Sequence, residues 1–167
     1  MIDKRRIKFL FAPLGVAVGI SAFILLFHRI VRTSGVPQPS HRVYIPRWII
    51  LAAGVLLIAF WIPVFIAGIL ALGRRGAVGQ ADGPVVKGIY KAVRNPIYSG
   101  VSFTIIGAGL CLNDAGVLLA GGFWFLLTFV QCLREEKELK VKYGRTYLDY
   151  QQSVPRFFPR LFMLQKN

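Results

Sequence analysis

The sequence is short of acidic residues, histidine and cysteine. It has 7 Asp and Glu against 21 Lys and Arg, with 2 His and 2 Cys in 167 residues. Cys111 and Cys132 both lie in apolar segments with no other Cys or His nearby, which argues against a metal site and a disulfide framework. No catalytic His or Cys motif is evident either.

Apolar residues, in contrast, make up 55% of the chain. A soluble domain of this size does not need so much apolar surface, and the apolar runs are long enough to cross a bilayer. The net charge of +14 is concentrated outside those runs. Basic residues in that position meet anionic lipid head groups and set topology, so nucleic acid is the weaker interpretation of the charge.

Four apolar segments predict four transmembrane helices, over about residues 7–30, 48–72, 96–112 and 116–133. Pro63 predicts a kink in the second. Only Asn113, Asp114 and Ala115 separate the last two, which predicts a tight antiparallel hairpin. The basic and then apolar N-terminus is like a signal peptide. Its apolar part is too long, however, and no small-x-small cleavage site follows, which favours a retained first span.

The distribution of Lys and Arg predicts that both termini face the cytoplasm. Basic residues precede the first segment, occupy the link between the second and third, and follow the fourth, while the link between the third and fourth has none. This is the positive-inside arrangement for an even number of crossings. The exceptions are Arg29, Arg32, Arg42 and Arg47, and some of these can snorkel from helix ends.

The sequence becomes charged after the fourth segment. Residues 134–144 favour a helix that ends at Gly144, and the alternation of Glu138, Lys140 and Lys142 is typical of a solvated helix face. The tail beyond mixes aromatic residues with Arg and Pro, which predicts an extended segment at the membrane interface. We therefore expect an all-α integral membrane protein with a cytoplasmic amphipathic C-terminal helix.

Residues 88–100 form a polar motif directly before the third segment, and it carries Tyr90, Arg94, Asn95 and Tyr98. Polar groups at the start of an apolar span are costly and usually serve a purpose. Proline is tolerated in the first turn of a helix and restricts the residue before it. A helix should therefore begin at Pro96, with Asn95 near its cap and several amide N–H groups free to meet a ligand.

The predicted hairpin would bring this motif close to Arg134, Glu135 and Glu136, which follow the fourth segment. A pocket built from these groups suits a zwitterionic or cationic cofactor, because carboxylates meet a positive group and backbone amides meet a carboxylate. Plainer roles stay open. Tyr90 and Tyr98 also fit an interfacial aromatic belt, and Arg94 also fits a topology signal.

A longer set of spaced residues extends these motifs. In order, it comprises Gly88-x-Tyr90, Arg94-Asn-Pro-x-Tyr98-x-Gly100, Glu135-Glu136, Leu139, Tyr143-Gly144, Tyr147, Tyr150, Val154-Pro155 and Pro159. This set resembles the isoprenylcysteine carboxyl methyltransferase and phospholipid methyltransferase superfamily. The resemblance covers roughly residues 82–161, and the first two apolar segments contribute nothing to it beyond hydrophobicity.

The resemblance implies a membrane-embedded methyltransferase that uses S-adenosylmethionine without a Rossmann domain. Residues 81–162 would form the cofactor-binding catalytic core, and residues 1–80 the two N-terminal spans and linkers. The cofactor would lie in a cytoplasm-facing pocket, and a lipid or lipidated substrate would enter from the bilayer. No protein partner is indicated. The implied cofactor-binding positions are Asp82, Gly83, Pro84, Val85, Tyr90, Asn95, Pro96, Ile97, Tyr98, Glu135 and Glu136.

Two positions depart from the family pattern. Members commonly have His at the position of Asn95, and because Asn does not titrate, a general-base role is not expected there. The eukaryotic prenylcysteine enzymes have a substrate-binding Arg near the position of Gln131. The nearest Arg here is Arg134, one helical turn later, and it is the candidate for orienting a carboxylate substrate. The substrate is thus either a phospholipid amine or a prenylcysteine-like carboxylate.

Two other functions compete with methyl transfer. A sterol-type membrane reductase would use NADPH, whose phosphate wants extra Arg or Lys contacts, whereas Glu135 and Glu136 favour a cationic cofactor. A non-catalytic membrane scaffold is excluded by no feature of the sequence.

Overall fold

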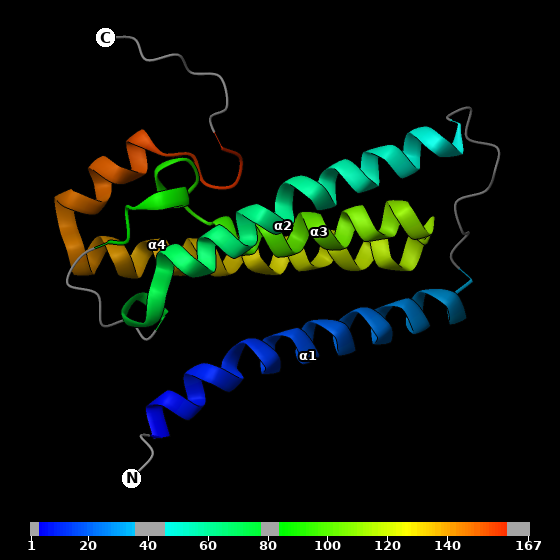
Figure 1. Cartoon of the computed structure of the whole chain (residues 1–167), viewed down its shortest axis with the longest axis horizontal. Coiled ribbons are helices and arrows are strands. Elements are labelled where there is room, and N and C mark those ends of the chain that lie inside the picture. The colour runs from blue at the N-terminus through cyan, green and yellow to red at the C-terminus, as the bar shows by residue number, and fades with distance from the viewer. Residues whose placement is uncertain (1–3, 36–45, 78–83, 160–167) are drawn as a thin grey trace.

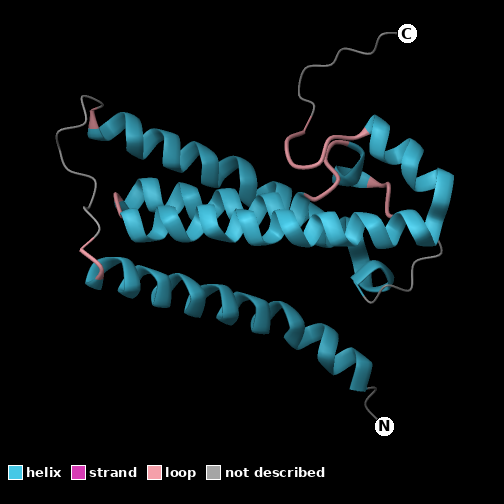
Figure 2. Ribbon diagram, turned by 180° about the vertical axis from the view of Figure 1, so that it is seen from behind, coloured by secondary structure: helices cyan, strands magenta, loops and turns pink. Residues whose placement is uncertain are grey.

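The computed structural model describes residues 4–35, 46–77 and 84–159, and these residues form helices and loops without a β-strand. In chain order the helices are α1 (Lys4–Thr33), α2 (Arg47–Ala77), the 3-10 helix η1 (Gly88–Lys91), α3 (Pro96–Leu112) and α4 (Ala115–Ser153). Figures 1 and 2 show α2, α3 and α4 side by side, with α1 next to α4. The all-α class predicted from the sequence is confirmed.

Two of the described helices are long and apolar enough to cross a membrane, α2 over Arg47–Gly73 and α4, while α3 is a shorter apolar helix. Large apolar side chains such as Leu56, Leu70 and Leu126 are exposed on α2 and α4. Exposed apolar surface of this extent fits a lipid environment rather than water. The number of spans and their orientation stay predictions.

Small residues let α2 and α3 approach closely. A Cβ atom on Gly100 of α3 would lie 2.5 Å from the Cβ atom of Phe65 in α2, so only glycine fits there. A Cβ atom on Gly107 would lie 2.9 Å from the carbonyl oxygen of Gly54. Close approach at small residues is the usual way in which helices associate in lipid. These glycines therefore serve helix packing.

The turn between α3 and α4 contacts α1 as well. Asn113 ends α3 in the left-handed conformation, with φ 56° and ψ 45°, which Asn tolerates better than most residues. Oδ1 of Asp114 accepts the Val117 amide at 3.0 Å and thereby caps α4. The same oxygen lies 3.0 Å from Nδ1 of His28 in α1. The turn thus ties three helices together.

Aromatic side chains continue the contact between α1 and α4. The ring of Phe23 stacks on Phe123 with centroids 6.0 Å apart, and it lies 5.6 Å from the ring of Trp124. Phe27 also stacks on Phe123, at 5.8 Å. Such ring pairs contribute stabilisation beyond that of the buried apolar area. The C-terminal half of α1 is therefore docked on α4.

Glycines mark the breaks in the two longest helices. Non-helical torsions occur in α2 at Gly73, where φ is 62°. The kink at Pro63 stays a prediction. In α4 they occur at Gly144, where φ is 53°. A positive φ is easy for glycine and costly for other residues. The helix end predicted at Gly144 is therefore confirmed, because the helix changes direction there.

The prediction of an extended tail directly after Gly144 is wrong for residues 145–153, which are helical. The reason is burial on one helix face. Tyr147 is only 3% exposed, and its ring lies 5.9 Å from that of Tyr150, three residues later. Residues three apart lie on the same side of a helix, so both rings pack against the bundle and stabilise the additional turns.

Candidate functional site

The start of α3 and the acidic residues of α4 meet at one end of the bundle. The hydroxyl of Tyr98 donates a hydrogen bond to Oε1 of Glu135 over 2.6 Å. Nε2 of Gln131, one helical turn before Glu135, donates to the same oxygen at 3.0 Å. Neither donor is charged, and among the described residues no Lys, Arg or His forms an ion pair with Glu135. Two neutral donors thus hold one oxygen of the Glu135 carboxylate.

Tyr90 lies in η1, on the same side as Glu135. Its burial, together with the charge of Glu135, raises the pKa of Tyr90 to about 12. The hydroxyl therefore keeps its proton at neutral pH and remains a hydrogen-bond donor. The hydroxyl of Tyr150 donates to the carbonyl oxygen of Tyr90 at 2.7 Å, which fixes η1 against the end of α4.

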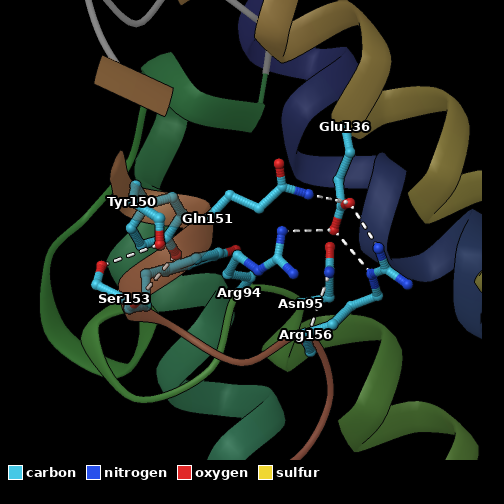
Figure 3. Close-up of polar contacts among 8 residues, drawn as sticks. Arg94, Asn95, Glu136, Tyr150, Gln151, Ser153 and Arg156 are labelled. Atoms are coloured by element: carbon cyan, nitrogen blue, oxygen red, sulfur yellow. Dashed lines mark hydrogen bonds and ion pairs between the residues drawn. The ribbon is translucent and has the colours of Figure 1, made fainter. Parts of the chain in front are cut away.

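Glu136, the neighbour of Glu135, has quite different partners. Its side chain is 5% exposed and lies between two guanidinium groups, as Figure 3 shows. Arg156 donates from Nε to Oε1 and from Nη2 to Oε2, both at 2.9 Å. Nη1 of Arg94 lies 2.9 Å from Oε1, and Nε2 of Gln151 donates to Oε2 at 3.0 Å. Both oxygens of Glu136 are thus occupied.

The electrostatics of this cluster follow from its burial. The side chain of Arg94 is 8% exposed and that of Arg156 is 27% exposed. The hydrogen bonds from Arg156 to Glu136 raise the pKa of the Arg156 guanidinium. Removal of either partner of a buried ion pair would leave an uncompensated charge.

Residues 154–159, here called the C-terminal segment, return to the start of α3. The amide of Arg94 donates to the carbonyl oxygen of Pro155 at 2.8 Å, and the amide of Asn95 donates to that of Arg156 at 3.0 Å. The hydroxyl of Ser99 donates to the carbonyl oxygen of Phe157 at 3.0 Å. The C-terminal segment is therefore fixed to the polar motif through its backbone.

Asn95 occupies the cap position of α3, as predicted, but its side chain does not cap the helix. Nδ2 instead lies 3.4 Å from the carbonyl oxygen of Arg156. The first i to i−4 hydrogen bond of α3 runs from the Ser99 amide to the Asn95 carbonyl oxygen at 3.1 Å. The amides of Ile97 and Tyr98 precede it and have no intrahelical acceptor.

Aromatic residues of the C-terminal segment pack on the apolar helices. Phe157 lies against Phe125 and Phe129 of α4, with ring centroids 5.1 Å and 5.8 Å apart. Phe158 lies 6.0 Å from Trp61 of α2 and 5.1 Å from Phe103 of α3, measured between ring centroids. The C-terminal segment therefore joins the polar cluster to the apolar interior of the bundle.

The other residues implied by the resemblance are distributed around this cluster. Pro84 and Val85 are half-buried before η1, while Asp82 and Gly83 lie outside the described residues. Pro96 and Ile97 face α2, because a Cβ atom on Gly68 would lie 3.0 Å from side-chain carbons of both. Arg134 is exposed on α4.

Two residues of the cluster were missed by the sequence reasoning, Arg156 and Gln151. Arg156 belonged to a tail interpreted as an interface segment, and Gln151 was not singled out. The one available signal was an Arg within an aromatic and proline-rich stretch, Val154-Pro-Arg-Phe-Phe-Pro159. Such a composition does not say which carboxylate the Arg will meet.

Fold and site together define an all-helical membrane protein with a buried polar cluster where an apolar helix becomes charged. A family model described as phospholipid methyltransferase matches residues 49–146, more than half of the chain, so the chain belongs to this family. Membership indicates methyl transfer to a lipid-type substrate. No curated protein and no solved structure matches the chain. The family match includes Tyr98, Glu135 and Glu136 and ends before Gln151 and Arg156.

Proposed function

We propose that the protein transfers a methyl group from S-adenosylmethionine to a lipophilic substrate in the membrane, either a phospholipid amine or a prenylcysteine-like carboxylate. The carboxylate of Glu135 carries this proposal. Neutral donors hold it, and among the described residues no cation neutralises it. A half-buried carboxylate held by neutral donors favours a positively charged ligand. The sulfonium and amino groups of S-adenosylmethionine meet this requirement.

The donor set of the site fits the rest of this cofactor as well. Tyr90 keeps its phenolic proton and can donate to an acceptor. The amides of Ile97 and Tyr98 lie at a helix start, where backbone N–H groups suit a carboxylate. We propose that these groups and residues 82–85 surround the cofactor, as the family resemblance implies.

S-adenosylmethionine supplies a methyl group activated for in-line displacement, a reaction that depends on positioning and desolvation more than on an acid–base pair. The protein therefore needs rigid contacts and exclusion of water. Tyr98 and Glu135 provide such a contact across α3 and α4. The aromatic rings of the C-terminal segment pack on α3 and α4 next to the cluster.

We assign Glu136 and Asn95 to positioning rather than to direct cofactor contact. Both oxygens of Glu136 are occupied by Arg94, Arg156 and Gln151, and the Asn95 side chain points to the C-terminal segment. These bonds hold α3, α4 and the C-terminal segment in one arrangement, which fixes Tyr98 next to Glu135. Arg134 is exposed one turn after Gln131, and we keep it as the residue that would orient a carboxylate substrate.

The site and the first described turns of α1 lie at the same end of the bundle in Figures 1 and 2. The basic residues of the sequence concentrate before α1, between α2 and α3, and after the apolar part of α4. The positive-inside rule places these regions in the cytoplasm. We therefore propose four spans, with both termini and the site on the cytoplasmic side.

Calorimetric titration of the detergent-solubilised protein with S-adenosylhomocysteine, the demethylated cofactor, tests the proposal. We expect the wild type to bind and Glu135→Ala to abolish binding. Lys140→Ala is the matched control, because Lys140 is exposed on the same helix and should leave affinity unchanged. Equal retention of binding in both variants would show that Glu135 does not bind the cofactor.

A second titration with NADPH separates the competing functions. Binding of NADPH without S-adenosylhomocysteine would indicate a membrane reductase and overturn the proposal. Binding of neither ligand would indicate a scaffold that has kept the fold of the family.

A further inference from the structure

Two guanidinium groups share a single carboxylate next to the proposed cofactor site. Arg156 binds Glu136 through two hydrogen bonds, and Arg94 lies 2.9 Å from the same side chain. The other acid of the region, Glu135, is bound by Tyr98 and Gln131 and not by an arginine. Glu136 can balance only one of the two positive charges, so this arginine pair is electropositive.

Arg94 and Arg156, the arginine pair, also have N–H donors that are not bonded to Glu136. Nε of Arg94 is buried and has no hydrogen-bond partner, while Nη1 pairs with Glu136 and the side chain also interacts with Tyr147. The Arg94 side chain as a whole is more than nine-tenths buried. Arg156 uses Nε and Nη2 for Glu136, and its side chain is the more exposed of the two. Buried donors without partners are rare in native proteins and call for an explanation. An anionic oxygen group of a ligand would satisfy them.

The position of Arg156 along α4 indicates where this ligand comes from. Its guanidinium lies over the ring of Phe129, 5.5 Å from the centroid, and it is bonded to Glu136 two turns later. Val130 and Leu126 are exposed on the apolar part of α4, whereas the exposed residues after Leu133 are mainly charged. The arginine pair thus lies where the helix leaves the apolar layer, the level at which phosphates of a bilayer are found.

We propose that Arg156 and Arg94 form a subsite for the phosphate of a glycerophospholipid, which holds the head group beside Tyr98 and Glu135. Guanidinium groups suit this role because their N–H groups match the oxygens of a phosphate. The inference rests on the proposed methyl-transfer function and narrows its substrate to a phospholipid amine. Arg156 lies beyond the matched residues 49–146, so family membership does not assign it this role.

Calorimetry with short-chain lipids tests the subsite without turnover. The probes are dihexanoyl phosphatidylethanolamine, dihexanoylglycerol, which lacks the phosphate, and inorganic phosphate. We expect the wild type to bind the phospholipid more tightly than either other probe. Arg156→Gln should weaken phospholipid binding by about 10- to 100-fold, the effect of losing a hydrogen bond to a charged group. Because Arg94 keeps its ion pair with Glu136, the variant should lose far less affinity for S-adenosylhomocysteine than for the phospholipid.

Three further variants distinguish phosphate binding by Arg156 from a purely structural role of this residue. Lys137→Gln removes an exposed positive charge on the same helix and should change neither affinity. Arg156→Lys keeps the charge without the paired donors and should lose part of the phospholipid affinity. Gln151→Ala removes a hydrogen bond to Glu136 but keeps both arginines, so it should retain phospholipid binding.

Several results would overturn the subsite. Loss of S-adenosylhomocysteine affinity in Arg156→Gln, in parallel with that for the lipid, would mean that the arginine pair binds the cofactor. Equal affinity of the wild type for phosphatidylethanolamine and inorganic phosphate would indicate a site for a soluble anion. Equal losses in Gln151→Ala and Arg156→Gln would indicate a structural role. Failure of the wild type to bind S-adenosylhomocysteine would instead refute the proposed function itself.

Discussion

Replacement of Glu136 by glutamine is the most direct perturbation of the cluster. The side chain keeps its shape and loses its negative charge, so Arg94 and Arg156 remain close together without compensation. Glutamine also offers only one acceptor oxygen, whereas Glu136 accepts from Arg156 and Gln151 with two. The change therefore removes the charge balance and part of the hydrogen bonding at once.

The expected size of the effect follows from burial. Removal of one partner from a buried ion pair destabilises a protein by about 3–5 kcal/mol. Arg156 is 27% exposed, so water screens part of the repulsion, and we expect the lower end, about 3 kcal/mol. For a chain of this length each kcal/mol lowers the midpoint of thermal unfolding by about 2–4 °C. Glu136→Gln should therefore lower the midpoint by about 6–12 °C.

Thermal unfolding in detergent, followed by tryptophan fluorescence, measures this shift. Glu138→Gln is the matched control, because Glu138 is exposed on the same helix and its loss should change stability by less than about 0.5 kcal/mol. Hydrogen exchange adds a local measurement. The amides of Arg94 and Asn95 donate to the C-terminal segment and should exchange faster in Glu136→Gln. Equal midpoints for the two variants would refute the view that Glu136 holds this segment.

Two other expectations concern the glycine contacts and the turn between α3 and α4. Gly100→Ala should destabilise the protein by about 1–3 kcal/mol, because the added methyl group would overlap Phe65, whereas Gly122→Ala meets no atom within 4 Å and should be neutral or slightly stabilising in the same unfolding assay. Burial raises the pKa of Asp114, but hydrogen bonds from the Val117 amide and His28 outweigh it and lower that pKa below its usual 3.8. The stabilisation from Asp114 is therefore complete above the pKa of Asp114 in the unfolded state and is lost as the pH falls through its pKa in the folded state. Asp114→Asn keeps a capping side chain but does not titrate. The unfolding midpoint of the wild type should therefore fall more steeply below about pH 4 than that of Asp114→Asn. If the unfolding midpoints of the two proteins fall in parallel as the pH is lowered, the ionised carboxylate of Asp114 does not contribute this stability.

The sequence predicts the half of the site that depends on local geometry. Pro96 begins α3 as expected, since proline favours the first turn and restrains the residue before it. The turn between α3 and α4 is short, and Tyr98 of α3 contacts Glu135 of α4, as the sequence predicts. Both inferences need only residues close in sequence or joined by one tight turn.

The partners of Glu136 could not be predicted in this way. Glu135 and Glu136 look like a pair in the sequence, but neighbouring residues of a helix point about 100° apart and meet different surroundings. The partner Arg156 arrives only because the chain turns at Gly144 and returns along α3. One positive φ thus decides a contact between residues far apart in the chain, and no local pattern encodes its direction.

The return of the C-terminal segment also sets an order of events during synthesis. The apolar part of α4 and Glu136 emerge from the ribosome before Arg156, which lies in the last stretch of described chain. Until then Glu136 has only Arg94 as a cationic partner, and the start of α3 lacks the hydrogen bonds from its amides to Pro155 and Arg156. The cluster is therefore complete only after the C-terminal segment has been synthesised. A chain that stops at Ser153 would keep the helices and lack the C-terminal segment that completes the cluster.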